Sequence, residues 1–329
     1  MDTLDVLVVG AGPIGIACGV EAKRNGLSCC LLERGCLTNA VYRFPPQLVF
    51  FSTAELLEIG DIPFIISGAK PTRSDILRYY RRVTEHYDLE VRMYEAVTEV
   101  APAESGRSFR IESEKGSYRA RHVVLATGFY DHPNRLGIPG ENLPKVSHFY
   151  TEPYPFFRRR VAVIGGQNSA AESALELFRN GAEVTLIHRR ETLGKSIKYW
   201  VRPDIENRIA EGSIRAFLGA TVERIDEETV TVRKADGATE VIENDFVFAM
   251  TGYHADLDFL QNVGVRLEGE KMRPSHDPET METNVERLYI AGVASGGMDT
   301  NRIFIENGRE HARHIMAHIA ARIAAEPGP

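Results

Sequence analysis

Short apolar runs recur along the chain, and the clearest of them end at a glycine. The runs at 4–9 and 161–164 each lead into a glycine-containing turn, and apolar residues then return at helical spacing. A short apolar run bounded by turn residues is typical of a buried strand, and the spacing that follows it is typical of a helix. The pattern therefore predicts two strand–turn–helix units, with helices at 13–25 and 169–180.

Other segments extend this pattern. Second strands are expected at 28–32 and 183–187, and the runs that end in Thr127-Gly128 and Thr251-Gly252 are expected to return to the turns. A helix is predicted at 73–87, and a last helix runs to about 324. The alternating segments predict a small antiparallel insertion at 89–93, 97–101, 108–113 and 117–121. The run at 287–293 is predicted to be the final strand of the first unit, because an inserted domain leaves that fold incomplete.

The two units are copies of one pattern. Adding 155 to a position carries Gly10 to Gly165, Gly15 to Ala170 and Glu33 to His188. A single Gly-x-Gly-x-x-Gly turn is a weak signal, but a repeated one in the same strand–turn–helix setting is specific. Two nucleotide sites are therefore predicted.

The first turn has the residues that bind a pyrophosphate. Gly10 permits a sharp turn, Gly12 lets the main chain approach the phosphates, and Gly15 lets the helix pack on its strand. The helix directs its free N–H groups at the anion. Glu33 ends the second strand, where a carboxylate can bind ribose hydroxyls. This unit should therefore bind an adenosine diphosphate group whose ribose is not phosphorylated.

The second turn differs at the tip of the second strand. His188, Arg189 and Arg190 replace the carboxylate, and Lys195 follows shortly after. Guanidinium groups suit a phosphate, so the second nucleotide should be NADPH. Gln167 stands where the middle glycine is expected. Either the backbone lies farther from the pyrophosphate there, or the amide bonds to it.

Composition narrows the class of protein. The 329 residues include 39 basic and 46 acidic side chains, for a net charge of −7, and 43% are hydrophobic. This balance argues against a nucleic-acid or anionic-membrane protein and fits a globular enzyme. No apolar run is long enough to span a membrane, and Asp2 and Asp5 stand where a signal peptide would be basic. We expect a cytoplasmic protein without a metal site.

The four cysteines all lie before residue 37, and no two form a Cys-x-x-Cys pair. Cys18, Cys29 and Cys30 fall in predicted core elements, where a cysteine is usually a small buried hydrophobe. Cys36 follows Glu33 on a loop beside the first nucleotide, so it is the candidate redox thiol. His148 is the candidate proton donor, although a single histidine in a loop is more often structural.

Several longer segments carry a family resemblance. They are Gly12–Ala17, Phe50–Gly60, His148–Pro153 and Ile303–Gly308, together with Ala126-Thr127-Gly128 and Ala291-Gly292. The two nucleotide sites, with the second placed as an insertion, and the two short segments together resemble the thioredoxin-reductase-like flavoproteins. Within that group, the four longer segments are similar to the bacillithiol disulfide reductase family. The resemblance covers nearly the whole chain. It implies a dimeric or larger FAD enzyme that oxidises NADPH and reduces a low-molecular-weight disulfide.

The chain also departs from these families. Thioredoxin reductases have a Cys-x-x-Cys before the second turn, and residues 140–160 contain no cysteine. Some bacillithiol reductases have a cysteine in the first turn, where this chain has Ile14. Val293 replaces the aspartate that usually follows Ala-Gly in the last flavin motif. Thiol chemistry next to the flavin is therefore in question.

These observations define the expected fold and sites. The fold class is α/β, with two Rossmann-like domains of the FAD/NAD(P)-binding, three-layer ββα type. The NADPH domain, 135–253, is inserted between the two parts of the FAD domain, 1–134 and 254–329. The residues predicted to bind FAD are Gly10, Gly12, Pro13, Ile14, Gly15, Glu33, Phe51, Thr127, Gly128, Gly292 and Ile303. The residues predicted to bind NADPH are Gly165, Gly166, Gln167, Asn168, Ser169, Ala170, His188, Arg189, Arg190, Lys195 and Gly252.

Three alternative functions remain open. A ferredoxin- or flavodoxin-type NADPH reductase needs FAD and NADPH but no thiols, so its partner would be a small redox-carrier protein rather than a small disulfide. A flavin monooxygenase is suggested by His148, but its motif requires Phe and Gly where this chain has Asn142 and Pro144. A non-catalytic NADPH sensor would also need both nucleotide turns.

Overall fold

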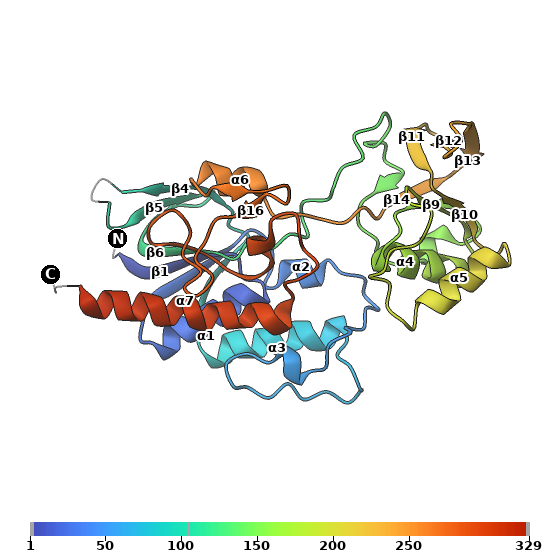
Figure 1. Cartoon of the computed structure of the whole chain (residues 1–329). Coiled ribbons are helices and arrows are strands. Elements are labelled where there is room, and N and C mark those ends of the chain that lie inside the picture. The colour runs from blue at the N-terminus through green and yellow to red at the C-terminus, as the bar shows by residue number, and fades with distance from the viewer. Residues whose placement is uncertain (1–2, 104–105, 327–329) are drawn as a thin grey trace. The chain divides into compact units, whose positions relative to one another are not determined.

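The computed structural model describes residues 3–103 and 106–326. The chain divides into two compact units, which Figure 1 colours along the sequence. Unit 1 comprises Met1–His132 and Tyr253–Pro329, and unit 2 comprises Pro133–Gly252. Unit 2 therefore interrupts unit 1 in the sequence, and each unit has hydrophobic clusters of its own.

Unit 1 is built on a mixed sheet with the strand order β3-β2-β1-β6-β5-β4, and β17 pairs with β6. Its strands are β1 (Leu4–Val9), β2 (Cys29–Glu33), β3 (Glu90–Met93), β4 (Val97–Pro102), β5 (Phe109–Ser113), β6 (Ser117–Leu125) and β17 (Leu288–Ile290). The pair β15 (Leu267–Glu268) and β16 (Arg273–Pro274) stands apart from this sheet. The parallel pairing of β17 with β6 confirms that the C-terminal run completes the first unit.

Helices cover this sheet and connect its strands. They are α1 (Pro13–Arg24), α2 (Asn39–Tyr42), η1 (Glu55–Leu57), α3 (Arg73–His86), α6 (Leu257–Asn262), η3 (Gly292–Gly296) and α7 (Ile305–Ala325). Helix α1 packs against both α3 and α7 (Figure 1). Thr72 is the N-cap of helix α3, and its hydroxyl accepts the Asp75 N–H in a capping box. Ile76, Tyr80 and Val83 recur at helical spacing and form its buried face.

Unit 2 contains a parallel sheet in the order β10-β9-β8-β14-β7 and an antiparallel sheet in the order β11-β12-β13. The parallel strands are β7 (Val146–Ser147), β8 (Arg160–Ile164), β9 (Glu183–His188), β10 (Arg215–Leu218) and β14 (Phe246–Ala249). The antiparallel strands are β11 (Thr221–Ile225), β12 (Thr229–Arg233) and β13 (Thr239–Glu243). The helices are η2 (Tyr154–Phe156), α4 (Asn168–Arg179) and α5 (Arg202–Ala210).

The expected antiparallel insertion in unit 1 is wrong in two respects. Residues 90–93 form β3, which pairs in parallel with β2 at the edge of the main sheet, with Cys30 opposite Glu90. Residues 117–121 are not a separate strand. They continue through the fully buried His122 to Leu125 and form one strand, β6. Alternation of polar and apolar residues does not reveal the direction of a neighbouring strand, and a polar residue inside a strand resembles a break.

Within the described ranges, no helix is both long and apolar enough to cross a membrane.

Candidate functional site

The first glycine turn lies where β1 meets α1. Gly10 has φ +105°, and a Cβ there would lie 2.5 Å from the carbonyl oxygen of Ala126, which follows β6. A Cβ on Gly15 would lie 2.0 Å from the Gly10 oxygen. Both positions therefore require glycine for the fold itself, because a side chain would displace the end of β6 or the start of α1.

Gly12 is different because the protein leaves it room. Its φ is −71°, which any residue can adopt. Apart from its chain neighbours, no heavy atom of the described residues lies within 4 Å of the position that a Cβ would take. Helix α1 then begins at Pro13 and has no side-chain cap, so the N–H groups of its first turn remain available. This open approach to a helix N-terminus is the arrangement that binds a pyrophosphate.

Glu33 lies at the end of β2, and 8% of the residue is exposed. One carboxylate oxygen accepts the Ala11 N–H at 2.9 Å, and the other accepts the Gly35 N–H at 2.8 Å. The carboxylate is thus fixed beside the glycine turn, and its remaining lone pairs are free to accept ribose hydroxyls. Sequence reasoning missed Thr38, which is buried, has φ 53° and donates its N–H to the Ala11 oxygen at 3.0 Å.

Ile14 brings the first turn into contact with the C-terminal part of unit 1. A Cβ on Gly292, φ +68°, would lie 2.9 Å from the Ile14 side chain. A Cβ on Gly308 would lie 3.3 Å from Ile303 and 3.4 Å from Ile14. Three of the residues predicted to bind FAD, Ile14, Gly292 and Ile303, therefore cluster around one point at the start of α7.

His311 also belongs to this region and was not predicted. Its Nδ1 accepts the Gly292 N–H at 3.1 Å. Burial lowers the pKa of His311 to about 4, and the neighbouring His276 and His314 act in the same direction. The imidazole is therefore neutral near pH 7 and holds the Gly292 turn as an acceptor. The only sequence signal for His311 is its spacing from Ile305 along the last helix.

Thr127 and Phe51 are the other informative positions. The hydroxyl oxygen of Thr127 is buried without a hydrogen-bond partner among the described residues, and Gly128 next to it has φ +72°. A buried hydroxyl without a partner is costly, so this atom suits a bound polar group. Phe51 is 39% exposed, and its ring lies edge-on to Phe304 with 5.6 Å between centroids.

The second turn repeats the first in unit 2. Gly165 has φ +149°, and a Cβ there would lie 2.5 Å from the Met250 oxygen and 3.0 Å from the Ala170 Cβ. Gly252, φ +85°, follows β14, and its oxygen accepts the Asn134 N–H at 2.9 Å. The end of β14 thus meets the Gly165 turn just as the end of β6 meets Gly10.

His188 lies against this turn. A Cβ on Gly166 would lie 2.4 Å from the imidazole, so only glycine fits beneath the ring. His188 is 7% exposed, and its Nε2 has no hydrogen-bond partner in the part of the chain that the structure describes. Burial lowers the pKa of His188, and Arg190 and Arg189 lower it further. A neutral His188 therefore offers a buried polar atom to a ligand, while the arginines supply the positive charge.

Arg189 and Arg190 follow β9 with exposed side chains, and Lys195 is exposed a few residues later. Asn168 and Ser169 begin α4, which has no side-chain cap at Gln167. The Gln167 side chain packs against Gly194, so its amide is turned toward the segment after β9.

Cys36 has surroundings that favour the neutral thiol. It is partly buried, and its Sγ lies 3.6 Å from the Asn39 Oδ1 as a hydrogen-bond donor. Burial raises the pKa of the Cys36 thiol, and the Glu33 carboxylate raises it further, although a backbone hydrogen bond and Arg73 act in the opposite direction. A nucleophilic cysteine needs a stabilised thiolate, so these contacts argue against a catalytic role.

His148 lies in unit 2, where it is 6% exposed, and its Nε2 is 3.2 Å from the Glu141 carboxylate. Glu141 also accepts the N–H groups of Leu136 at 2.6 Å and Gly137 at 2.8 Å. Burial and Arg135 lower the pKa of His148, although Glu141 raises it. This buried pair fixes the first segment of unit 2, and a proton-transfer role for His148 stays a prediction.

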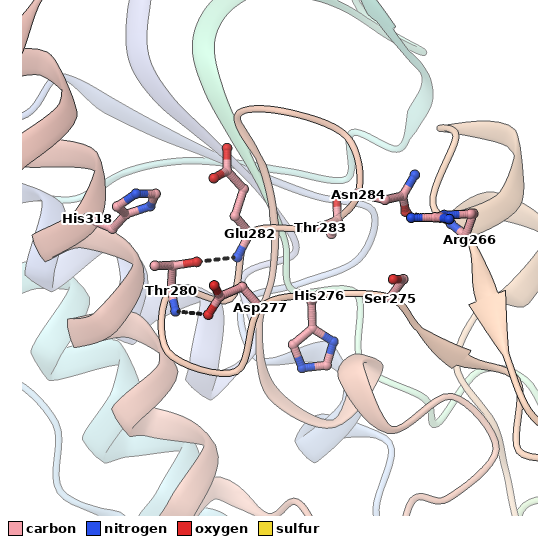
Figure 2. A pocket seen from close by; sticks show the side chains of 9 residues that line it. All are labelled: Arg266, Ser275, His276, Asp277, Thr280, Glu282, Thr283, Asn284 and His318. Atoms are coloured by element: carbon pink, nitrogen blue, oxygen red, sulfur yellow. Dashed lines mark hydrogen bonds between the residues drawn. The ribbon is translucent and has the colours of Figure 1, made fainter.

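A polar pocket of about 300 Å³ lies elsewhere in unit 1 (Figure 2). Its described lining includes His276, Asp277, Glu282 and His318 but no residue predicted to bind a cofactor. The Asp277 carboxylate accepts the N–H of Thr280 at 3.1 Å, as Figure 2 shows, and Glu282 accepts the Arg322 guanidinium at 2.7 Å. These carboxylates stabilise the fold of this segment. Among the described residues, no group of three or more potential metal ligands is found.

Two equivalent dinucleotide turns, one beside a carboxylate and one beside paired arginines, define a flavoprotein that uses a nicotinamide nucleotide. Comparison with known proteins agrees. Residues 7–292 match the pyridine nucleotide-disulphide oxidoreductase family, and the chain belongs to that family. Flavin and nicotinamide cofactors are the cofactors of such enzymes, and the two-domain Rossmann fold predicted from the sequence is the one found.

The individual relatives are close. The chain is 44% identical over 316 residues to bacilliredoxin reductase Bdr of Bacillus subtilis, covering 96% of this chain and 97% of the relative. Among solved structures, bacillithiol disulfide reductase Bdr from Bacillus cereus is 42% identical with a TM-score of 0.94, covering 98% of this chain and 100% of the other. The enzyme of the same name from Staphylococcus aureus is 39% identical with a TM-score of 0.94, covering 98% and 99%. The predicted resemblance to this group of reductases is thus confirmed.

Proposed function

We propose that the protein oxidises NADPH through a bound FAD and reduces a low-molecular-weight disulfide of the bacillithiol type. The cofactor assignment rests on the difference in charge between the residues at the end of β2 and those that follow β9. Glu33 presents a carboxylate beside the turn of unit 1, whereas Arg189 and Arg190 follow the equivalent strand of unit 2. The disulfide substrate is supported by the similarity to the bacillithiol disulfide reductases from Bacillus cereus and Staphylococcus aureus.

The residues of unit 1 would hold FAD through its adenosine, pyrophosphate and central chain. Glu33 would accept the ribose hydroxyls, and the uncapped start of α1 would bind the pyrophosphate beside Gly12. The Thr127 hydroxyl and the Gly292 turn would bind other polar parts of the cofactor. When bound, FAD supplies a ring that accepts a hydride and passes its electrons to the acceptor.

The residues of unit 2 would bind NADPH and select it. The Gly165 turn and α4 would bind the pyrophosphate, and the arginine pair would bind the 2′-phosphate with charge-assisted hydrogen bonds. His188 would stay neutral and offer its free nitrogen as a hydrogen-bonding atom. We further propose that the enzyme acts in the cytoplasm, and as a homo-oligomer.

The acceptor can be tested by reoxidation. The purified protein should show a flavin spectrum that NADPH bleaches without oxygen, and bacillithiol disulfide should then restore it quickly. A small one-electron carrier protein should restore it slowly. Fast reoxidation by the carrier alone would reject the disulfide assignment and favour a ferredoxin-reductase activity.

Cys36 provides a separate prediction. Replacing Cys36 with Ser should leave disulfide reduction within about twofold of the wild type, because the neutral, hydrogen-bonded thiol is not set up as a nucleophile. The rate of disulfide-dependent NADPH oxidation measures this. Cys18→Ser is the matched control for a buried cysteine. Loss of activity in Cys36→Ser, with the flavin still reduced by NADPH, would instead make Cys36 the thiol that attacks the substrate.

A further inference from the structure

The segment after β9 is held on the second glycine turn by a regular set of contacts. The Gly194 N–H donates to the Gly166 oxygen at 2.7 Å. The Ser196 hydroxyl donates to the Gln167 side-chain oxygen. The Lys198 N–H donates to the Asn168 side-chain oxygen at 3.1 Å. We call the segment 189–201 the strap. Three consecutive turn residues, 166–168, therefore bind three alternate residues of the strap, 194, 196 and 198.

The strap is also anchored by buried side chains in the hydrophobic cluster of unit 2. Leu193, Ile197 and Val201, each four residues apart, are at most 8% exposed and belong to the hydrophobic cluster of unit 2. Between them, Lys195, Ser196 and the 48% exposed Trp200 are exposed, whereas Gly194 is buried against the turn. These three buried side chains anchor the strap in the hydrophobic cluster. The hydrogen bonds with the turn then determine where the exposed residues of the strap lie.

Gln167 makes the most distinctive of these contacts. Gly12, the equivalent residue of unit 1, has an open Cβ position and an extended φ of −71°. Gln167 has the same extended backbone, with φ −106°, but its side chain fills the space against Gly194, where a Cβ would lie 2.0 Å from the amide oxygen. The residue that replaces the usual glycine is thus turned toward the strap.

We propose that Gln167 is a positioning residue for nucleotide selectivity, which holds Lys195 beside the turn by binding the strap on both sides of it. Gly194 and Ser196, the two neighbours of Lys195, are the residues that Gln167 contacts. Lys195 has no ion pair among the described residues, so its ammonium group is available for a phosphate. Arg190 is held independently, because its carbonyl accepts the Gly219 N–H at 2.8 Å. This inference rests on the proposed NADPH function of unit 2.

The test measures dissociation constants of NADP⁺ and NAD⁺ by calorimetry on the FAD-loaded protein. Gln167→Ala and Ser196→Ala should each weaken NADP⁺ binding about three- to tenfold, the usual effect of losing one such contact, and change NAD⁺ binding less than about twofold. Ser196→Thr keeps the hydroxyl and should bind NADP⁺ like the wild type. In a Lys195→Ala background, Gln167→Ala should add less than about twofold, whereas in an Arg190→Ala background its effect should persist.

A second readout follows the strap without any ligand. Trp200 is the one tryptophan in the sequence, so its fluorescence quenching by iodide reports on the strap alone. Gln167→Ala should make Trp200 more accessible to iodide than in the wild type, and Gln167→Glu, which keeps an acceptor for Ser196, should not.

The outcomes separate the two proposals. Equal weakening of NADP⁺ and NAD⁺ by Gln167→Ala would mean that Gln167 binds the shared pyrophosphate, and it would overturn the positioning role. Unchanged binding of both would overturn it too. If Arg189→Ala and Arg190→Ala weaken NADP⁺ binding while Gln167→Ala does not, only the strap inference fails. If the arginine variants also have no effect, the NADPH assignment itself fails.

Discussion

Glu33 and His188 occupy equivalent positions in the two units, and their immediate contacts explain why one fold can distinguish two nucleotides. The Glu33 side chain accepts hydrogen bonds from two backbone N–H groups. The His188 ring lies over Gly166, and burial, followed by the two arginines after it, lowers its pKa. A carboxylate repels a 2′-phosphate, whereas exposed guanidinium groups bind it. In the proposed function, single residues at the ends of otherwise similar strands would thus decide which nucleotide is bound.

The arginine pair gives the first prediction at this scale. Replacing both Arg189 and Arg190 with Ala should raise the KM for NADPH by tenfold or more and leave the KM for NADH nearly unchanged, because each charge-assisted contact contributes about 1.5–3 kcal/mol. Steady-state kinetics with both nucleotides measures this. Arg224→Ala, on β11 and paired with Asp226, is the control for loss of a surface arginine. An equal loss with both nucleotides would contradict the assignment.

His122 gives a prediction about pH. Burial lowers its pKa to about 4, and Arg287 and Arg322 lower it further, although the Asp5 oxygen, 3.1 Å from Nδ1, raises it. The unfolded chain takes up this proton near pH 6.5, roughly its ordinary value, and the folded chain does so only near 4. Stability should therefore fall as pH drops from about 6.5 to 4, by up to about 3 kcal/mol, and then level off. Denaturant unfolding of His122→Phe should show a shallower fall over this range, and an unchanged slope would reject this explanation.

The two glycine turns show that glycines within one motif serve different purposes. Gly10 is required by the protein, since its φ is +105° and the end of β6 passes 2.5 Å from its Cβ position. Gly12 is not required by the protein, since its backbone is extended and its surroundings are open. The open space at Gly12 therefore suits the close approach of a bound group, which is consistent with the proposed cofactor site at this turn.

This difference can be measured with two variants. Gly12→Ala should leave the thermal stability of the FAD-free protein unchanged or slightly higher but weaken FAD retention, because the new methyl group stands where the pyrophosphate approaches. Gly10→Ala should lower stability even without FAD, by about 1–3 kcal/mol, because it strains the backbone. Melting curves of the FAD-free variants and FAD titrations test both. A destabilised Gly12→Ala apoprotein would show that Gly12 has a structural role.

Sequence patterns predicted the elements that repeat and missed those that depend on contacts. The strand–turn–helix units were found because glycines and apolar runs leave a strong local signal. The predicted direction of β3 was wrong, because strand pairing is decided by neighbours distant in sequence. Helix α5 was missed, because it is short and begins after Val201 without a side-chain cap. The role of Gln167 could not be predicted either, because nothing local pairs it with Ser196.

At the scale of the whole molecule, unit 2 has the properties of an independent domain. Its two ends meet, because the Asn134 side chain donates to the Thr251 oxygen at 3.1 Å and the Thr251 hydroxyl donates to the Asn134 oxygen at 2.6 Å. Its two hydrophobic clusters are built from its own residues. A domain with adjoining ends and its own core can be inserted into another fold without disturbing it, and it can often fold alone.

The final prediction therefore concerns a fragment comprising residues 133–252. It should fold cooperatively and bind NADP⁺ with a dissociation constant within about threefold of the intact protein, because the turn, the arginines and the strap all lie inside it. Circular dichroism and calorimetry measure folding and binding, and the fragment with Arg189→Ala and Arg190→Ala is the matched control, which should fold but bind NADP⁺ weakly.

Asn134→Ala should lower the melting temperature of the fragment, because it removes the side-chain contact between the two ends. A folded fragment that does not bind NADP⁺ would mean that part of the nucleotide site is supplied from outside unit 2, and an unfolded fragment would mean that the inserted domain depends on its host for stability.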